Sequence, residues 1–301
     1  MLGISINKNI LILHFTVLIW GFTGILGDLI TVSALHLVWY RVLIAAVSLF
    51  VYFVLSGKSI HVDRGRLIQF LLVGGVVGLH WVLFFHAIKI STVSVTLVTL
   101  SAVTLFTAIL EPIINKKKIS LADVTVGLLI IFGIYLIFKF EIQYLWGIIY
   151  GLSCAFCASI FSVLNARMVK KSSPTLITFY EMLGALCWVT LFMLFSGDFN
   201  AEMWLSSSDL IYLLILGVFC TAVAYALGVA VMKELSAFTV ALTTNMEPVY
   251  GIILALLIFG QKEAMSTGFY LGAVIVLTAV FIYPYLKTRL VFKARPGADI
   301  S

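Results

Sequence analysis

Continuously apolar stretches of roughly 20 residues, about ten in number, take up almost the whole chain. A helix needs roughly 20 apolar residues to cross the hydrocarbon core of a bilayer, so each stretch is long enough to span it. The stretches lie near residues 10–28, 34–56, 67–88, 92–114, 120–139, 145–167, 175–196, 209–232, 236–260 and 266–286. They are continuous rather than alternating, which excludes the strands of a membrane β-barrel. The sequence therefore predicts an all-α integral membrane protein with about ten transmembrane helices.

The composition excludes a soluble domain. Charged residues make up 11% of the chain and the mean hydropathy is +1.17, whereas about 25% of a typical soluble protein is charged. The first stretch has some features of a signal peptide, since Lys8 precedes it and residues 32–34 form a loose cleavage site. Its apolar core, residues 10–26, exceeds the roughly 15 residues usual for such a peptide, so we expect a retained first helix.

Lys and Arg are distributed unequally between the two sides of the predicted membrane. If the N-terminus is cytoplasmic, fifteen of them fall in cytoplasmic loops or the C-terminal tail and three in outer loops, with Arg41 inside the membrane. The fifteen are Lys8, Lys58, Arg64, Arg66, Lys116, Lys117, Lys118, Arg167, Lys170, Lys171, Lys233, Lys287, Arg289, Lys293 and Arg295, and the outer three are Lys89, Lys139 and Lys262. Basic residues collect on the cytoplasmic side, so both termini are predicted to be cytoplasmic.

The net charge of +6 is therefore mainly a signal of topology. No aromatic residues are interleaved with the basic ones, so we expect contact with the lipid bilayer and no nucleic acid partner. The predicted location is the cell membrane, as a multi-pass protein.

The chain contains an internal repeat. Residues 38–46 recur about 140 residues later as residues 178–185, and the Ser/Thr-rich residues 89–97 recur as residues 233–242. Each copy of the first match places a Tyr beside a charged residue inside an apolar run. These pairs are Tyr40-Arg41 and Tyr180-Glu181. Such a repeat, with charge inside hydrocarbon, is typical of transporters built from two related halves.

The repeat divides the chain into two halves of opposite orientation. Five helices in each half is an odd number, so the second half enters the membrane from the other side and the repeats are inverted. The predicted organisation is a first five-helix repeat over residues 1–140, a second over 141–286, and a basic cytoplasmic tail over 287–301.

Three charged side chains lie deep in the predicted helices, namely Arg41, Glu181 and Glu247. A charge near a helix centre costs about 2.5–3.5 kcal/mol and is kept where it faces a partner or a wet cavity. Arg41 and Glu181 lie at opposite depths, roughly 10 Å or more apart along the membrane normal, so we expect separate partners for them. Arg41 either snorkels outward or holds a substrate carboxylate. Glu181 either binds an amine or carries a proton.

The ninth stretch is predicted to break at Pro248, which cannot donate a hydrogen bond to the carbonyl of Thr244. Thr243, Asn245 and Glu247 surround this break at mid-depth, where transporters place substrate or ion sites. The alternative is a helix–helix hydrogen-bond network that closes the same kink.

Glu111 and Pro112 form a similar pair in the fourth stretch. Pro112 predicts a hinge there, because it also lacks a backbone donor. Glu111 stands about a turn from the basic residues 116–118, and we expect it to cap or pair with that turn.

Histidine and aromatic residues are further candidates for a cavity wall. His80 lies at mid-depth in the third stretch, where it either relays protons or bonds to a neighbouring helix. The aromatic candidates, which can instead simply pack between helices, are Trp20, Tyr40, Trp81, Phe84, Tyr180 and Tyr225.

Several cofactors are not expected. His86 stands six residues after His80, which is not a metal-binding spacing on a helix. Cys154 and Cys157 lie mid-helix without a second ligand pair, so packing is expected of them, and no disulfide. No phosphate-binding loop is present to use ATP directly. Coupling to protons or to exchange stays open.

The chain resembles the ten-helix drug/metabolite transporters of the EamA type over residues 9–286. The residues that carry the likeness are Trp20-Gly21, Tyr40-Arg41, the Ser/Thr-rich starts of the fourth and ninth helices, and residues 247–250. One departure is Thr104, which stands where a proline is expected, with Pro112 further on. That departure shifts the predicted break in the first half and makes the halves less alike.

The resemblance implies a secondary transporter with a central cavity between the repeats, which moves small metabolites by alternating access. Amino acids, nucleotide bases, sugars and drugs are its substrate classes. The charges of Arg41 with Glu181 or Glu247 favour a zwitterionic or anionic small molecule, amino acids first.

The alternative is an integral membrane enzyme or lipid-handling protein acting at the bilayer interface. Such proteins usually carry their reactive groups on sizeable loops, whereas here the loops are short and the acids lie inside helices. A signalling or scaffold role lacks an extramembrane domain to carry it. The direction of transport and the oligomeric state stay open.

Overall fold

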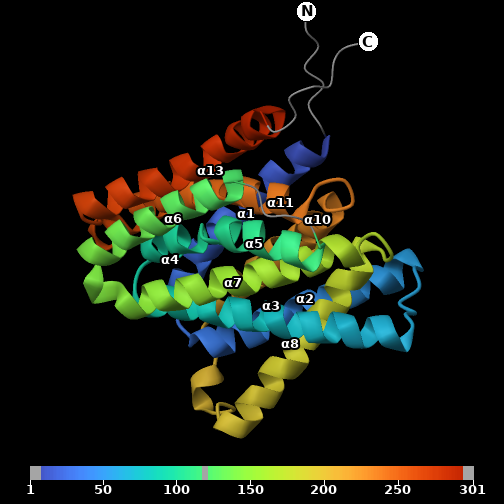
Figure 1. Cartoon of the computed structure of the whole chain (residues 1–301). Coiled ribbons are helices and arrows are strands. Elements are labelled where there is room, and N and C mark those ends of the chain that lie inside the picture. The colour runs from blue at the N-terminus through green and yellow to red at the C-terminus, as the bar shows by residue number, and fades with distance from the viewer. Residues whose placement is uncertain (1–7, 117–120, 294–301) are drawn as a thin grey trace, which may run out of the picture.

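The computed structural model describes residues 8–116 and 121–293, which form helices joined by short connections (Figure 1). The first half comprises α1 (Lys8–Leu29), α2 (Ala34–Ser56), α3 (Arg64–Ile90), α4 (Val93–Leu100), α5 (Val103–Ile114) and α6 (Leu121–Phe140). The second half comprises α7 (Leu145–Met168), α8 (Pro174–Ser196), α9 (Ser207–Gly217), the π-helix η3 (Val218–Val223), α10 (Ala224–Val231), α11 (Ala237–Thr244), α12 (Met246–Phe259) and α13 (Thr267–Lys293). Short turns of 3-10 helix are η1 (Ile142–Tyr144), η2 (Ala201–Met203) and η4 (Gly260–Glu263). The predicted all-α class is confirmed.

Eight helical segments among the described residues are long and apolar enough to cross a membrane, counting α4–α5, α9–α10 and α11–α12 as one each. The described parts of α6 and α13 add two shorter apolar stretches, Thr125–Phe140 and Thr267–Ala279. Large apolar side chains such as Leu55, Phe195 and Leu257 are 77–85% exposed, as residues that contact lipid are. The chain is therefore a multi-pass membrane protein.

The C-terminal boundary differs from the prediction. Helix α13 continues to Lys293, so the first part of the predicted tail, residues 287–293, is helical. Residues 294–301 lie outside the described part of the chain, as do Lys117 and Lys118.

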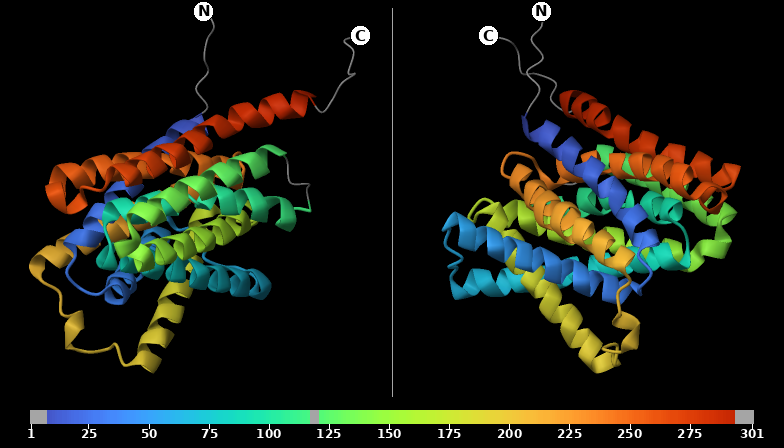
Figure 2. Two further views of the ribbon diagram at one scale, coloured as in Figure 1. Left: turned by 60° about the vertical axis from the view of Figure 1, so that its left-hand side comes forward. Right: turned by 180° about the vertical axis from the view of Figure 1, so that it is seen from behind.

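Helices α6 and α13 pack side by side along one face of the bundle, and α2, α3 and α8 lie at the opposite face (Figures 1 and 2). Packing partners recur between the halves. Helix α3 packs on α7 and α8, and the corresponding segment α9–α10 packs on α1 and α2. In the same way α7 packs on α4 and α5, and α1 packs on α11 and α12. The packing pattern of the first half is thus repeated in the second.

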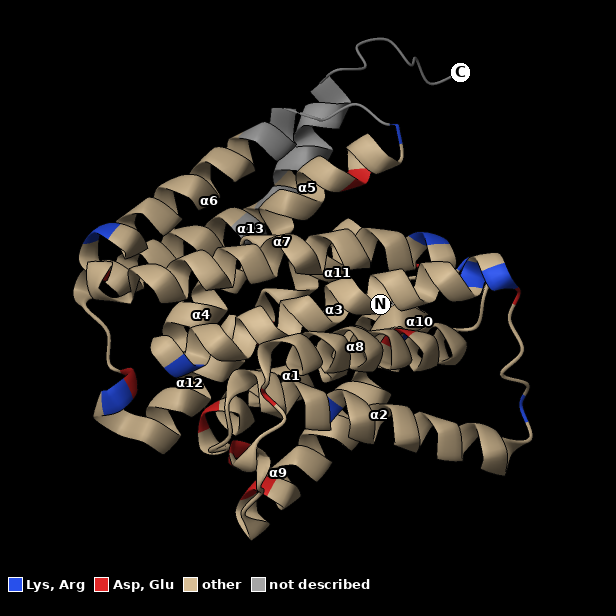
Figure 3. Ribbon diagram, turned by 90° about the horizontal axis from the view of Figure 1, so that it is seen from below, with Lys and Arg blue, Asp and Glu red and all other residues tan. Residues whose placement is uncertain are grey.

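Polar side chains mark where helices begin. Ser33, Asp63, Ser173, Ser206 and Ser236 each accept a hydrogen bond from the backbone N–H three residues later. These bonds satisfy donors that a helix start leaves free. Lys and Arg gather mainly at the two ends of the bundle, and the ribbon between is largely uncharged (Figure 3).

Two helices are broken near their centres. Helix α11 ends at Thr244 and α12 begins at Met246, so the break predicted beside Pro248 is present, at Asn245. The break in the first half lies at residues 101–102, between α4 and α5.

The break in the first half therefore does not lie at Pro112, and the hinge predicted there stays a prediction. Pro112 lies inside α5, close to its C-terminal end, where a missing N–H removes one hydrogen bond without ending the helix. Thr104, which stands where a proline was expected, lies at the start of α5, as Pro248 lies at the start of α12. The two halves are more alike at the centre than the sequence indicated, because α4 and α11 each contain 8 residues before the break.

Helices α3 and α8 approach closely at two glycines. A Cβ atom built on Gly184 would lie 2.4 Å from the carbonyl oxygen of Leu71, and one on Gly74 would lie 2.3 Å from that of Glu181. No side chain fits in either place, and small residues are what allows membrane helices to pack this tightly.

We expect Gly184→Ala to destabilise the protein by about 1–3 kcal/mol, because the added methyl group forces α3 and α8 apart. The thermal unfolding midpoint in detergent measures the change. Gly65→Ala is the matched control, since its Cβ atom would meet only Asp63 Oδ1, at 3.4 Å. Equal midpoints for the two variants would show that the close approach is not needed.

Candidate functional site

A cavity of about 100 Å³ lies at the centre of the bundle, lined from both halves of the chain. Its wall is mostly aromatic and aliphatic, including Trp20, Trp81, Phe84, Leu100, Val103, Phe161, Tyr225, Met232 and Val240. Charged or titratable side chains reach it at Arg41, His80 and Glu247. A small, mainly apolar cavity with a few placed polar groups is the usual form of a small-molecule site.

Arg41 of α2 is held rigidly at this cavity. Its Nε donates to Thr221 Oγ1 at 2.6 Å, and its guanidinium carbon stands 4.1 Å from the centre of the Trp81 ring. The side chain is only 1% exposed, so the snorkelling alternative is wrong. Its Nη1 is buried and has no hydrogen-bond partner. An oriented guanidinium with an unused donor is suited to an incoming carboxylate.

The acceptor for Arg41 comes from the wide turn of η3. Thr221 Oγ1 donates to the carbonyl of Leu216, five residues earlier, at 2.7 Å, and accepts from Arg41. Single π-turns inside α-helices occur frequently at functional sites. Nothing in the run of apolar residues around Thr221 indicated this turn, so sequence reasoning missed the residue.

Glu247 reaches the cavity from the broken helix. It lies in the first turn of α12 and is 6% exposed. Among the described residues no cation lies within 4.0 Å of its carboxyl oxygens. The cavity therefore presents a basic group from α2 and an acidic group from α12 that do not neutralise each other by direct contact.

Asn245 joins the two helix breaks and does not itself line the cavity. Its Nδ2 donates to Thr104 Oγ1 at 2.5 Å and to the carbonyl of Ala241 at 2.8 Å. Thr104 Oγ1 also lies 3.3 Å from that same carbonyl. At Asn245 the helix–helix network that the sequence left as an alternative is present.

Glu181 lies behind the cavity wall. Its Oε2 accepts hydrogen bonds from Tyr225 Oη at 2.8 Å and from Asn165 Nδ2 at 3.3 Å. Tyr225 and Asn165 line the cavity and Glu181 does not. Glu181 and Arg41 have separate partners, as predicted. Asn165 was missed, although a polar amide within an apolar stretch was a signal that could have found it.

His80 has the predicted contact with a neighbouring helix, and the predicted proton relay stays a prediction. Its Nδ1 lies 3.0 Å from the carbonyl oxygen of Cys154 on α7, and its ring lines the cavity. Cys154 and Cys157 are buried free thiols, and Cys154 serves α7 packing at its contact with α3.

Tyr40 and Tyr180 do not line the cavity, contrary to prediction. Tyr40 donates to the carbonyl of Met203 at 3.0 Å, and Tyr180 donates to that of Ile60 at 2.7 Å. Neighbouring residues on a helix point about 100° apart. Tyr40 therefore faces away from the cavity that its neighbour Arg41 lines, whereas Tyr180 and its neighbour Glu181 both lie outside the lining.

A larger hollow of about 820 Å³ opens at one end of the bundle, and we name it the vestibule. It is lined by Arg66, Gln69, Phe70, Glu111, Asn115, Leu164, Ala166, Arg167, Met168, Lys170, Lys171, Ser172, Met232, Glu234, Leu235 and Ser236. Met232 lines both the vestibule and the central cavity. Its basic residues are among those predicted from the charge distribution to be cytoplasmic.

Glu111 Oε2 accepts a hydrogen bond from the backbone N–H of Phe238 at 2.8 Å, at the start of α11. The predicted cap or pair with the basic turn involves Lys117 and Lys118, which lie outside the described residues. At the other end of the bundle, Glu263 accepts from the backbone N–H groups of Val93 and Ser94 at 2.9 Å, at the start of α4.

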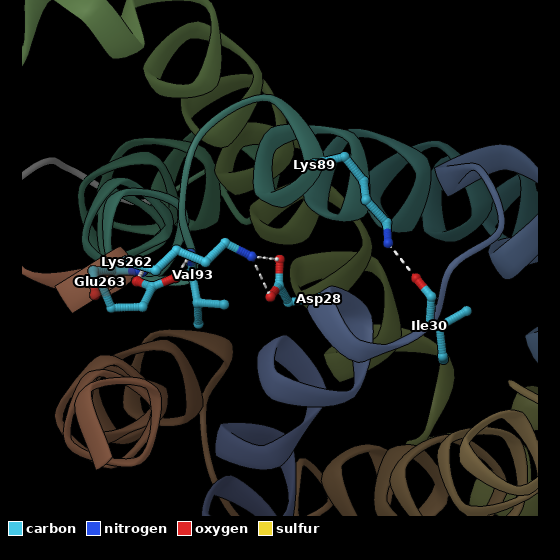
Figure 4. A network of polar contacts seen from close by, with 7 residues as sticks. Asp28, Ile30, Lys89, Val93, Lys262 and Glu263 are labelled. Atoms are coloured by element: carbon cyan, nitrogen blue, oxygen red, sulfur yellow. Dashed lines mark hydrogen bonds and ion pairs between the residues drawn. The ribbon is translucent and has the colours of Figure 1, made fainter. Parts of the chain in front are cut away.

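Polar contacts tie the two halves together at the end opposite the vestibule. Lys262 of the second half donates to Asp28 of the first at 2.6 and 2.9 Å (Figure 4). Lys89 makes a contact within the first half, where it donates to the carbonyl of Ile30. Asp209 accepts from Thr31 N and Oγ1 at 2.7 Å. Arg66 and Lys89 mark the two ends along α3, about 35 Å apart at 1.5 Å per residue.

A bundle of membrane-spanning helices that encloses a small, mainly apolar cavity with a few charged groups near its centre is the arrangement of a membrane transporter. The chain matches the EamA-like transporter family over residues 7–139 and 145–283, and it belongs to that family. Members of this family are transporters, and the resemblance found in the sequence is confirmed.

One solved structure, titled only "Crystal structure of protein", has 16% sequence identity and a TM-score of 0.70. The match covers 95% of this chain and 100% of that one. At this identity the likeness shows the fold alone. No curated protein sequence matches the chain.

We expect Asn245→Leu and Thr104→Val each to destabilise the protein by about 1–3 kcal/mol, because each leaves a buried polar partner unsatisfied. The double variant should lose less unfolding free energy than the sum of the two single losses. Unfolding in detergent should give a coupling energy of about 0.5–3 kcal/mol. Thr243→Val is the control, since Thr243 bonds only within its own helix, to the carbonyl of Thr239. Additive losses of unfolding free energy would show that the hydrogen bond between Asn245 and Thr104 does not connect the two broken helices energetically.

Proposed function

We propose that this protein is a secondary active transporter of the cell membrane that moves zwitterionic amino acids with apolar side chains by alternating access. The observation that carries the proposal is the pair of opposite, directly unpaired charges, Arg41 and Glu247, at one small aromatic cavity.

The carboxylate of the substrate pairs with Arg41. Thr221 fixes Nε, and Trp81 supports the face of the guanidinium, so Nη1 remains as the group for a ligand oxygen. Charge-assisted hydrogen bonds to guanidinium are stronger than neutral ones. The same ion over an aromatic ring gains a further cation–π contribution, which keeps its orientation fixed.

The ammonium group of the substrate pairs with Glu247, and its side chain contacts the apolar wall. Trp20, Phe84 and Phe161 offer aromatic surface there, and Val103 and Val240 offer aliphatic surface. Apolar side chains gain free energy in proportion to the area that such walls remove from water. Amino acids such as leucine and phenylalanine fit this combination.

Alternating access is supported by the difference between the two ends of the bundle. The vestibule is a wide hollow on one side of the cavity, whereas Lys262, Asp28, Asp209 and Thr31 join the halves on the other. The arrangement corresponds to a transporter open toward the side with the basic loops. Opening the opposite side requires these contacts between halves to separate.

Counterflow in proteoliposomes tests the proposal, with unlabelled leucine inside and labelled leucine outside. Wild-type protein should accumulate label, and Arg41→Ala or Glu247→Gln should reduce the initial rate by about tenfold or more, since each removes a charged hydrogen-bond partner. Arg64→Ala and Glu202→Gln are matched controls, because both side chains are exposed and outside the cavity. The proposal fails if Arg41→Ala and Glu247→Gln both transport leucine normally in folded protein.

A further inference from the structure

Glu181 is a buried acid with no cation beside it. Its side chain is 0% exposed, and among the described residues no Lys, Arg or His nitrogen lies within 4.0 Å of its oxygens. Removing an unpaired carboxylate from water is strongly unfavourable, so such a group is neutral instead. Glu247 differs, because it lines the same cavity as the Arg41 cation, whereas Glu181 does not. In the arrangement of this structure Glu181 therefore holds a proton.

The hydrogen bonds to Glu181 are shared unevenly between its two carboxyl oxygens. Asn165 Nδ2 donates to Tyr225 Oη at 2.9 Å and to Glu181 Oε2, and the Tyr225 hydroxyl donates to that same Oε2. Both hydrogen bonds to the carboxyl group therefore end on Oε2. The other oxygen, Oε1, is buried and has no partner, and the same holds for Asn165 Oδ1. An ionised carboxylate would thus leave one of its oxygens buried without a donor, which is unfavourable.

The groups that face Glu181 leave no other source of compensating charge. Helix α8 packs against α2, α3 and α10, and Tyr225 of α10 is the titratable group in contact with it. Arg41 of α2, His80 of α3 and Glu247 of α12 line the cavity and make no hydrogen bond to Glu181. Other titratable groups on α2 and α3 contact different neighbours, namely His36, Tyr40, Tyr52, Arg66, His86 and Lys89.

Tyr225 and Asn165 separate this carboxyl group from the substrate cavity. The Tyr225 ring lies edge-on to Trp81 at 5.8 Å, and Trp81 in turn supports Arg41. A ligand that binds at Arg41 therefore presses on the same aromatic side chains that seal Glu181. Leu164 and Ala166, the neighbours of Asn165, line the vestibule, so water there lies close to the seal.

We propose that Glu181 is the proton-binding site of this transporter, with Tyr225 and Asn165 as the seal that substrate binding opens. The inference rests on the proposed function and adds its coupling ion. Because Glu181 is protonated when sealed, opening the seal can only release the proton. The O–H bond of the carboxyl breaks, the proton passes to water in the vestibule, and the carboxylate regains a proton when the opposite side opens. Substrate and proton are exchanged across the membrane.

The test uses Glu181→Gln, whose amide keeps the size and neutral hydrogen bonding of a protonated acid. Purified wild-type protein in weakly buffered detergent solution should release about one proton when leucine is added, read with a pH-sensitive dye, and Glu181→Gln should release none. In proteoliposomes the variant should retain leucine counterflow and lose accumulation driven by a pH gradient. Glu202→Gln, an exposed acid on η2, should behave as wild type in both assays.

Each outcome bears on one of the two proposals. Absence of leucine counterflow in wild-type protein overturns the proposed function, and the inference falls with it. Counterflow without proton release, or proton release that persists in Glu181→Gln, overturns the inference and leaves the function standing. If Glu181→Gln does not fold, infrared difference spectra of wild type and Glu181→Asp replace it. Leucine should then remove a protonated-carboxyl band that shifts in the variant, and an unshifted band would exclude Glu181.

Discussion

Backbone groups inside a bilayer have no water to bond to, and the two broken helices are where this constraint is hardest to meet. The protein meets it by pairing the breaks, since Asn245 bonds to Thr104 across the two helices. The helix starts are satisfied reciprocally. Glu263, which follows α12, caps α4, and Glu111 of α5 caps α11. Each broken helix thus completes the start of the other, and neither would be stable in hydrocarbon alone.

The paired breaks also determine where charge can lie. A helix that ends at mid-depth and starts again places Glu247 in a first turn, where its side chain lines the cavity. Asn245, two residues earlier, instead uses its amide group to bond to Thr104 and to the carbonyl of Ala241. Arg41 lies in the unbroken helix α2, and its side chain is held by the Thr221 hydroxyl and the face of the Trp81 ring. Arg41 and Glu247 are therefore positioned by different residues, which keeps them from forming a direct ion pair.

The sequence predicted the helices well, because the thickness of the hydrocarbon core sets the length of the apolar run, which is a local property of the sequence. It also predicted that Arg41, Glu247 and His80 reach the centre, because polar groups at mid-depth have few other places to go. It misplaced Tyr40 and Tyr180, since adjacency along a helix separates side chains around its axis. The break near Ser101 was missed for a different reason, as it depends on contact with the second half of the chain.

The π-helix η3 shows how one residue can align two distant polar clusters. Thr221 lies in the wide turn and holds Arg41, whereas Tyr225 lies just beyond it and holds Glu181. A regular α-helix lacking that extra residue would rotate everything after the turn by about 100° relative to everything before it. Thr221 and Tyr225 would then no longer point toward Arg41 and Glu181 at the same time. The orientation of the Arg41 cluster relative to the Glu181 cluster therefore depends on the one extra residue in the π-helix.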